Sequence, residues 1–97
     1  MSRFLIIIYD SGIDADVTEV LDRPPITGWT KLFDAHGVGG TGRKANDPAW
    51  PGLNNVALIA LPEEAVQEVK ERLRAVQALF TKKPGITIIS TPAEVLE

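Results

Sequence analysis

The chain has 97 residues, of which 44% are hydrophobic and 24% are charged, and its formal net charge is −3 at pH 7. A chain of this length supports one hydrophobic core, so we expect a single domain over residues 1–97. Acidic and basic residues are interspersed, which argues against nucleic-acid binding, since that requires clustered lysine and arginine. The sequence has no cysteine, which excludes disulfides and thiolate metal sites. No segment approaches the roughly 20 apolar residues that span a bilayer, so we expect a cytoplasmic protein without membrane insertion.

The first half of the chain predicts a strand, a helix and a second strand. Residues 3–9 are apolar at successive positions, which is typical of a strand buried on both faces. Apolar residues at helical spacing predict a short helix over residues 13–21, and Pro24 and Pro25 end it. Residues 28–35 alternate loosely and predict a less buried strand. The glycine-rich stretch after this strand, residues 36–54, has no periodicity.

The second half predicts a strand, a helix and a last strand. Residues 55–61 form another strand that is apolar on both faces. Pro62 suits the first helical position, and an apolar stripe then runs from Val66 to Phe80. A basic turn leads into a strand over residues 85–91, which we expect Pro92 to end. The order β-α-β-β-α-β predicts an α+β, ferredoxin-like sandwich, in which a four-stranded antiparallel sheet carries two helices on one face.

The predicted fold leaves one face of the sheet without a cover. Two helices cover the other face, yet the first and third strands read as apolar on both sides. A large exposed apolar patch is rare on a soluble monomer. We therefore expect a homo-oligomer in which sheet faces pack together.

Three glycines, Gly37, Gly39 and Gly42, match the GxGxxG spacing of a dinucleotide-binding turn. That fingerprint requires a strand before it and a helix after it, because the helix N-terminus holds the pyrophosphate. A strand is predicted before these glycines, but the residues after them are rich in proline and glycine, which break helices. The sequence therefore excludes a Rossmann site here. A long connection in a compact domain is nevertheless usually functional.

Four segments of the chain together carry a resemblance to a known family. They are Gly28-Trp29-Thr30 in the second strand, Gly37 to Lys44 at the start of the long connection, DPAWPGLNNV over residues 47–56 and the closing TIISTPAEVL over residues 87–96. With these segments the chain resembles the P-II signalling proteins, a family of ferredoxin-like trimeric sensors known from nitrogen regulation. TIISTPAEVL resembles the last strand and tail of the family, and DPAWPGLNNV resembles a P-II-like branch with a shorter loop. The order of elements matches over nearly the whole chain.

The resemblance implies a homotrimer that binds an adenine nucleotide in clefts between subunits. Carried over by position, Gly28 and Thr30 would face the adenine and ribose. The phosphates would lie near Gly37, Gly39 and Arg43 and near a second group, Lys82, Lys83 and Gly85. Glycines let backbone amides approach a phosphate, and lysine or arginine supplies the countercharge.

The resemblance also implies that residues 35–52 form a flexible loop that signals to a regulated protein, such as a transporter or an enzyme. The loop residues expected to meet that partner are Gly40, Gly42, Lys44 and Trp50. Trp50 could instead pin the loop to its own core. The turn KKPG is shorter than the glycine-rich turn of members that bind ATP firmly, and the sequence ends at Glu97, before the arginine-bearing extension of those members. The candidate ligands are therefore ATP, ADP, AMP or a different small molecule.

Two other functions stay open at this point. His36 is the only histidine, and it could bind a divalent cation if one histidine from each subunit met around a symmetry axis. The chain would then be a metal-responsive protein that resembles the divalent-cation tolerance trimers, which share this architecture. His36 could equally be a solvated loop residue. A weak hydrolase is a third possibility, but the sequence offers no set of nucleophile, base and orienting group. We therefore expect a protein that is not an enzyme.

Overall fold

The computed structural model describes residues 1–39, 42–43 and 53–97. In chain order, its strands and helices are β1 (Ser2–Asp10), α1 (Asp14–Leu21), β2 (Thr30–Ala35), β3 (Val38–Gly39), β4 (Gly42–Arg43), β5 (Asn54–Pro62), α2 (Val66–Gln77) and β6 (Ile86–Ala93). Short 3₁₀ turns, Ser11–Ile13 and Glu63–Ala65, lead into the two helices. The order confirms the predicted βαββαβ pattern, with the small β3–β4 ribbon added between β2 and β5.

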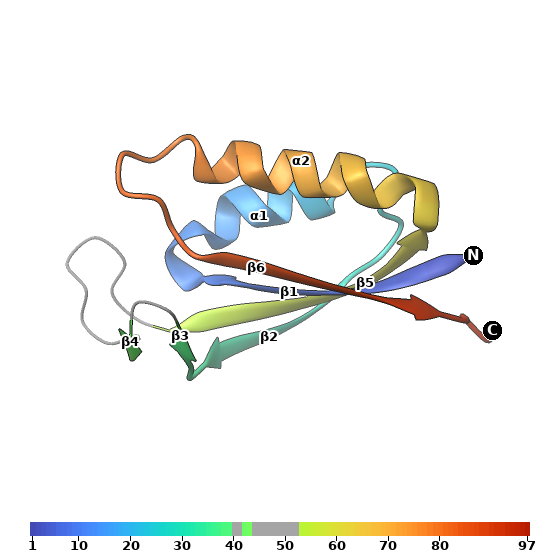
Figure 1. Cartoon of the computed structure of the whole chain (residues 1–97), viewed down its shortest axis with the longest axis horizontal. Coiled ribbons are helices and arrows are strands. Elements are labelled where there is room, and N and C mark those ends of the chain that lie inside the picture. The colour runs from blue at the N-terminus through green and yellow to red at the C-terminus, as the bar shows by residue number, and fades with distance from the viewer. Residues whose placement is uncertain (40–41, 44–52) are drawn as a thin grey trace.

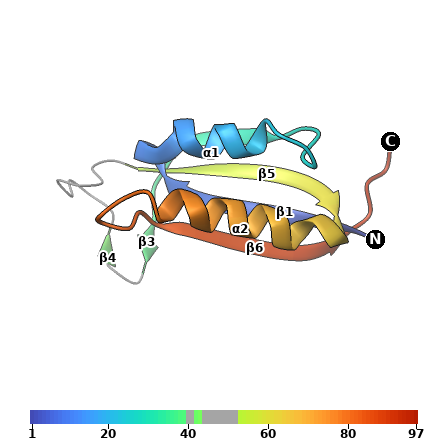
Figure 2. The ribbon, with the colours of Figure 1, turned by 90° about the horizontal axis from the view of Figure 1, so that it is seen from above.

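The main sheet has the strand order β2-β5-β1-β6, and its pairs are all antiparallel. Helices α1 and α2 lie side by side over one face of the sheet, as Figures 1 and 2 show. β1 and β5, which are apolar at every position over residues 4–9 and 56–61, are the two central strands. This arrangement confirms the ferredoxin-like prediction.

The core lies between the sheet and the helices. Alternate residues of β1 point into it, and Leu5 and Ile7 are fully buried there. From the helices, Val17 and Leu73 pack against them and are also fully buried. Burying such a side chain contributes about 1.5–3 kcal/mol, so this single interface accounts for much of the stability of the chain.

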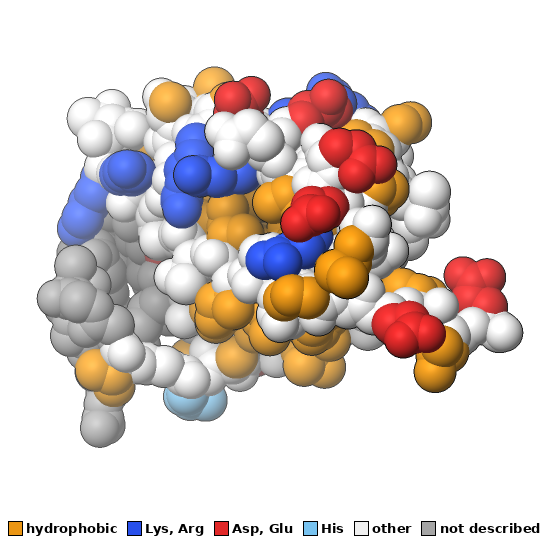
Figure 3. Space-filling model, turned by 45° about the vertical axis from the view of Figure 1, so that its right-hand side comes forward, with side chains coloured by type: hydrophobic (Ala, Val, Ile, Leu, Met, Phe, Trp, Pro, Cys, Tyr) orange, Lys and Arg blue, Asp and Glu red, His pale blue; other side chains and the backbone are white. Residues whose placement is uncertain are grey.

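The other face of the sheet is apolar but uncovered by any described segment. The alternation of β1 and the strand register place seven large apolar side chains there. Those on β1 and β5 are half-buried, whereas Leu32 and Ile89 are 56% and 46% exposed. Figure 3 shows hydrophobic side chains gathered below the sheet, away from the helices. We call this set the outer face: Phe4, Ile6, Ile8, Leu32, Val56, Leu58 and Ile89.

Several boundaries differ from the prediction, and two of these differences concern residues that the sequence analysis singled out. The second strand begins at Thr30, so Gly28 lies before it, in a segment that is neither helix nor strand. The prediction that Pro92 ends the last strand is wrong, because β6 continues to Ala93 and Pro92 pairs in register with Arg3. β6 is an edge strand, where the missing N–H of a proline can face away from the ladder.

Candidate functional site

Four strand ends meet where the predicted phosphate-binding residues lie. β1 and β2 finish at this end of the sheet, and β5 and β6 begin there. Backbone hydrogen bonds close it: the Asp10 N–H donates to the Gly85 carbonyl oxygen at 3.1 Å, and the Ser11 N–H donates to the Leu53 carbonyl oxygen at 2.9 Å. We call this the loop end of the sheet. Figures 1 and 2 show that the β3–β4 ribbon and the turn before β6 both lie there.

Two side chains of α2 hold the backbone of the basic turn before β6. The Gln77 side chain, itself buried, donates to the carbonyl oxygen of Pro84 at 2.7 Å, and Pro84 is also buried. Arg74 donates to the carbonyl oxygen of Ile86 at 3.0 Å. Lys82 and Lys83 are both exposed. The turn therefore presents two ammonium groups from an anchored backbone, which suits binding of an anion such as phosphate.

The predicted glycines follow β2 on the opposite edge of the sheet. Gly37 comes shortly after β2, and a Cβ at that position would lie 3.4 Å from Nδ2 of Asn54, so the chain passes close to the start of β5. Gly39 ends β3, and Arg43 ends β4. Of the residues predicted to meet a partner, Gly42 lies in β4. The other three, Gly40, Lys44 and Trp50, lie outside the described residues.

The strand order separates the two sets of predicted phosphate-binding residues within one chain. The glycines follow β2 and the lysines precede β6, and β5 and β1 lie between these two edge strands. Neighbouring strands are about 4.8 Å apart, so the ends of β2 and β6 are separated by roughly 14 Å. Thr30 pairs with Leu58, about five residues along β2 from the loop end, which corresponds to roughly 16 Å of strand. The predicted residues therefore form three separate groups on one chain.

Two of the predicted glycines have no structural requirement for glycine in the chain itself. A Cβ built on Gly28 or on Gly85 meets no atom within 4 Å, and neither residue has the left-handed backbone that favours glycine. A larger residue would therefore fit both positions in the isolated chain. Close approach of a ligand or of another subunit is a physical reason for keeping glycine there.

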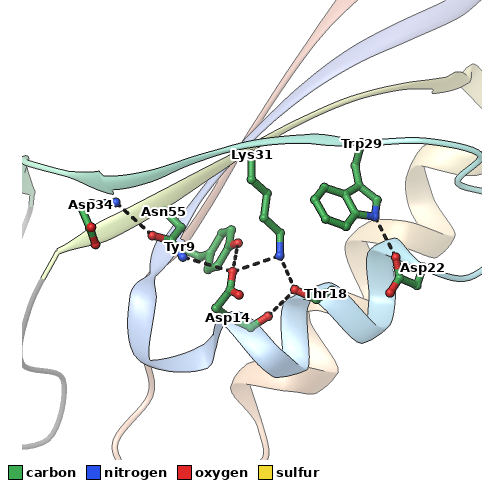
Figure 4. Close-up of polar contacts among 8 residues, drawn as sticks. All are labelled: Tyr9, Asp14, Thr18, Asp22, Trp29, Lys31, Asp34 and Asn55. Carbon is green, nitrogen blue, oxygen red and sulfur yellow. Dashed lines mark hydrogen bonds and ion pairs between the residues drawn. The ribbon is translucent and has the colours of Figure 1, made fainter.

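A polar network that the sequence analysis did not predict joins β1, α1, β2 and β5 (Figure 4). Oδ1 of Asp14 accepts hydrogen bonds from the Tyr9 hydroxyl at 2.6 Å, from Nζ of Lys31 at 3.1 Å and from Nδ2 of Asn55 at 3.1 Å. Lys31 also donates to the Thr18 hydroxyl, which in turn donates to the Asp14 backbone carbonyl at 2.7 Å. These contacts link residues up to 41 positions apart, so no local sequence pattern could have shown them.

Burial and hydrogen bonding together determine the protonation of Tyr9 and Asp14 in this network. Burial raises the pKa of the Tyr9 hydroxyl, and its hydrogen bond to Asp14 raises that pKa further, so Tyr9 remains a proton donor. Burial of Asp14 by itself raises the pKa of the carboxyl, but hydrogen bonds from Tyr9, Lys31 and Asn55 and the charge of Lys31 outweigh it. The pKa of Asp14 therefore lies below its ordinary value, and Asp14 is ionised opposite a lysine whose side chain is only 3% exposed.

Aromatic rings enclose the lysine on β2. Nζ of Lys31 lies 4.6 Å from the centroid of the Trp29 ring and 5.9 Å from that of Phe33, both within the range of a cation–π attraction. The Trp29 indole N–H donates to Oδ1 of Asp22 at 2.8 Å, which ties the start of β2 to the end of α1 (Figure 4). This arrangement fixes β2 against α1, and it leaves Phe33 62% exposed.

The predicted metal ligand lies on the surface. His36 is exposed, just after the end of β2. The part of the chain that the structure describes holds no group of three or more histidine, aspartate or glutamate residues able to bind a metal ion. No helix of that part is long and apolar enough to cross a membrane.

A groove of about 250 Å³ lies elsewhere, between the two helices. Val20 and Val76 form its buried floor, and its rim includes Arg23 and Arg72, which pair with glutamates one turn away. None of the predicted nucleotide-binding residues lines this groove.

Comparison with known proteins gives a match in structure only. No protein-family model matches the chain, and no curated protein matches it. CPII, a nitrogen regulatory PII-like protein from Thiomonas intermedia K12 solved with ADP, AMP and bicarbonate, is 20% identical with a TM-score of 0.67, and the match covers 93% of this chain and 85% of CPII. A PII-like signalling protein from Thermus thermophilus is 18% identical with a TM-score of 0.58, over 93% of this chain and 84% of that one.

A protein of unknown function from Pediococcus pentosaceus ATCC 25745 also matches, at 19% identity and a TM-score of 0.63, over 99% of this chain and 95% of that one. The chain thus has the fold of the PII-like signalling proteins. This finding confirms the predicted resemblance at the level of the fold.

Proposed function

We propose that this chain is a PII-like regulatory protein, a homotrimer that binds an adenine nucleotide between subunits and signals through residues 35–52 to a partner such as a transporter or an enzyme. The observation that carries the proposal is the division of the predicted binding residues between the two edges of a sheet whose fold is shared with CPII. CPII has been solved with ADP and with AMP. In an oligomer, the β2 edge of one subunit can meet the β6 edge of the next. Residues that lie far apart within one chain can then complete a single site between two subunits.

The outer face supports assembly of several copies. Its seven side chains are apolar, and two of them are about half exposed. On proteins in aqueous solution, an exposed apolar patch of this kind marks an interaction surface. A contact between two unlike edges repeats from subunit to subunit. The subunits form a closed ring when the rotation from one to the next adds up to a full turn. A trimer of this kind would bury the outer faces toward its centre.

The loop end of the sheet supplies the chemistry for a phosphate. Lys82 and Lys83 are exposed cations on an anchored turn, and Gly85 has open space where a side chain would be. Glycine backbone at Gly37 and Gly39 can offer N–H groups to phosphate oxygens. We assign the adenine and ribose to Gly28 and Thr30 of the neighbouring subunit.

A thermal-shift series with ATP, ADP and AMP, each with and without Mg²⁺, tests this proposal. A ligand that binds only the folded protein stabilises it by about 2.7 kcal/mol at a hundredfold excess over Kd. We expect a shift with at least one nucleotide. In the double variant Lys82→Ala/Lys83→Ala, the affinity for that nucleotide should fall about tenfold or more, because both cations contact phosphate.

The matched control is Lys70→Ala, which removes an exposed lysine on α2 outside the proposed site. It should bind like the wild type. Equal affinity of the double variant and the control would rule out the lysine turn as a phosphate site. Absence of a shift with all three nucleotides would contradict the proposed ligand class. The cation-binding alternative predicts that His36→Ala loses divalent metal, but no observation among the described residues favours it.

A further inference from the structure

The chain leaves β2 through an irregular backbone. The β2–β5 register runs regularly from Thr30 to Leu32 and then shifts by one residue before Ala35, which pairs with Asn54. Within this bulge, Asp34 has a φ of 59°, in the left-handed region that residues other than glycine, asparagine and aspartate rarely adopt. A bulge turns the strand and redirects the residues beyond it. The residues redirected here are Ala35 to Gly37.

One buried side chain holds this bulge. Asn55 is 3% exposed and lies on β5. Its Oδ1 accepts a hydrogen bond from the backbone N–H of Asp34 at 3.2 Å, and its Nδ2 donates to Oδ1 of Asp14 at 3.1 Å. Figure 4 shows Asn55 between the other two residues. Because the amide both donates and accepts, it joins the bulge to the Tyr9–Asp14–Lys31 network with its two ends in fixed roles.

We propose that Asn55 and Asp34 are positioning residues that set the path of the chain from β2 to Gly37, and thereby set the affinity of the proposed site for phosphate. The inference rests on the proposed function, because it takes the Gly37 backbone as a phosphate contact. Neither residue touches the ligand. They act by holding the backbone that does, and a displacement of about 1 Å is enough to weaken a set of oriented hydrogen bonds.

The left-handed conformation of Asp34 provides a sharp test. Glycine and valine at this position differ mainly in whether they tolerate a positive φ. Glycine adopts a positive φ without cost, whereas valine, which is β-branched, does so only under strain. The Asp34 side chain is exposed, so neither change leaves a cavity in the core. We expect Asp34→Gly to bind ADP within about twofold of the wild type, and Asp34→Val to bind roughly tenfold more weakly, by isothermal titration calorimetry.

A second variant addresses the side chain that holds the bulge. Asn55→Ala removes the acceptor for the Asp34 N–H, and it should also weaken ADP binding by roughly tenfold. The matched control is Thr18→Val, which removes a hydroxyl on the α1 side of the same network but leaves the Asn55–Asp34 contact intact. The control should lower the melting temperature without changing the ADP affinity. This comparison separates positioning from general loss of stability.

The outcomes distinguish the inference from the proposed function. Wild-type affinity in both Asp34→Val and Asn55→Ala would overturn the inference and leave nucleotide binding by the wild type standing. Equal weakening in Thr18→Val and Asn55→Ala would overturn it as well, because the effect would then follow stability alone. If Asn55→Ala does not fold, the Asp34 pair decides. A wild-type protein that binds none of ATP, ADP and AMP would contradict the proposed function and the inference together.

Discussion

The two faces of the sheet are both apolar, but only one of them is complete within the chain. On the helix side, Leu5 and Ile7 are fully buried beneath α1 and α2. On the other side, Ile6 and Ile8 of the same strand are only half-buried, and Leu32 is 56% exposed. The difference shows that β1 is apolar on two sides, one of which is covered when the chain folds. We propose that the other side is covered when copies of the chain assemble.

The largest effect on stability is expected on the inner face. Ile7→Ala should lower the free energy of unfolding by about 2–5 kcal/mol, since it removes a fully buried side chain and leaves a cavity. Urea denaturation followed by circular dichroism measures this loss. Ile8→Ala, one position along on the outer face, should cost less at protein concentrations low enough to dissociate an oligomer. Equal losses would contradict the division between the faces.

A charge on the outer face should prevent assembly without unfolding the chain. Ile6 lies between Leu58 and Ile89 on the neighbouring strands, so Ile6→Glu would place a carboxylate at the centre of the proposed contact. Light scattering after size exclusion should show the mass fall from three chains to one, while the circular dichroism spectrum is retained. Gln67→Glu, on the exposed side of α2, is the control and should keep the oligomer. An unchanged mass for Ile6→Glu would place the contact elsewhere.

The next largest effect on stability is expected in the polar network around Asp14. Lys31 is nearly buried, and Asp14→Asn removes the negative charge opposite it. The variant should lose about 1–3 kcal/mol of unfolding free energy at neutral pH. The pKa of Asp14 is lowered in the folded state, so its contribution is present above the ordinary carboxyl pKa and is lost as the pH falls through the folded-state pKa. Denaturation at several pH values should therefore show the gap between wild type and variant closing below about pH 4. A gap that widens in acid would contradict the ionised state of Asp14.

The smallest effect is expected at the edge of the sheet. Trp29→Phe removes the hydrogen bond to Asp22 while keeping an aromatic ring near Lys31, and Trp29 is 39% exposed. The loss should be about 0.5–1.5 kcal/mol. A double-mutant cycle with Asp22→Ala measures the pair directly. An interaction energy near zero would show that this contact does not help hold β2 on α1.

Much of the fold could be predicted because its signals are local. The runs over residues 3–9 and 55–61 are apolar at successive positions, and these segments are the two central strands. The helices followed from apolar stripes at helical spacing. The extent of the last strand was not predictable from Pro92, because a proline is tolerated at a sheet edge and the sequence does not show which strands are edges.

The candidate site was predictable only in part. Glycines and lysines at the loop end could be proposed from the resemblance, and the structure places Gly37, Gly39, Lys82 and Lys83 at that end. The Asp14–Lys31–Asn55 network joins residues 17 and 41 positions apart, and no pattern in the sequence specifies those contacts. The bulge at Asp34 was also missed, because a positive φ in a residue other than glycine depends on its surroundings.

Binding of ADP to the wild type and to the Ile6→Glu variant, measured by equilibrium titration at matched chain concentrations, tests the central claim most directly. If the nucleotide lies between subunits, the wild type should bind one ADP per chain, and the monomeric variant should bind none at the same concentrations. Equal binding by the monomeric variant would show that the site lies within one chain. Absence of binding by the wild type would contradict ADP as the ligand.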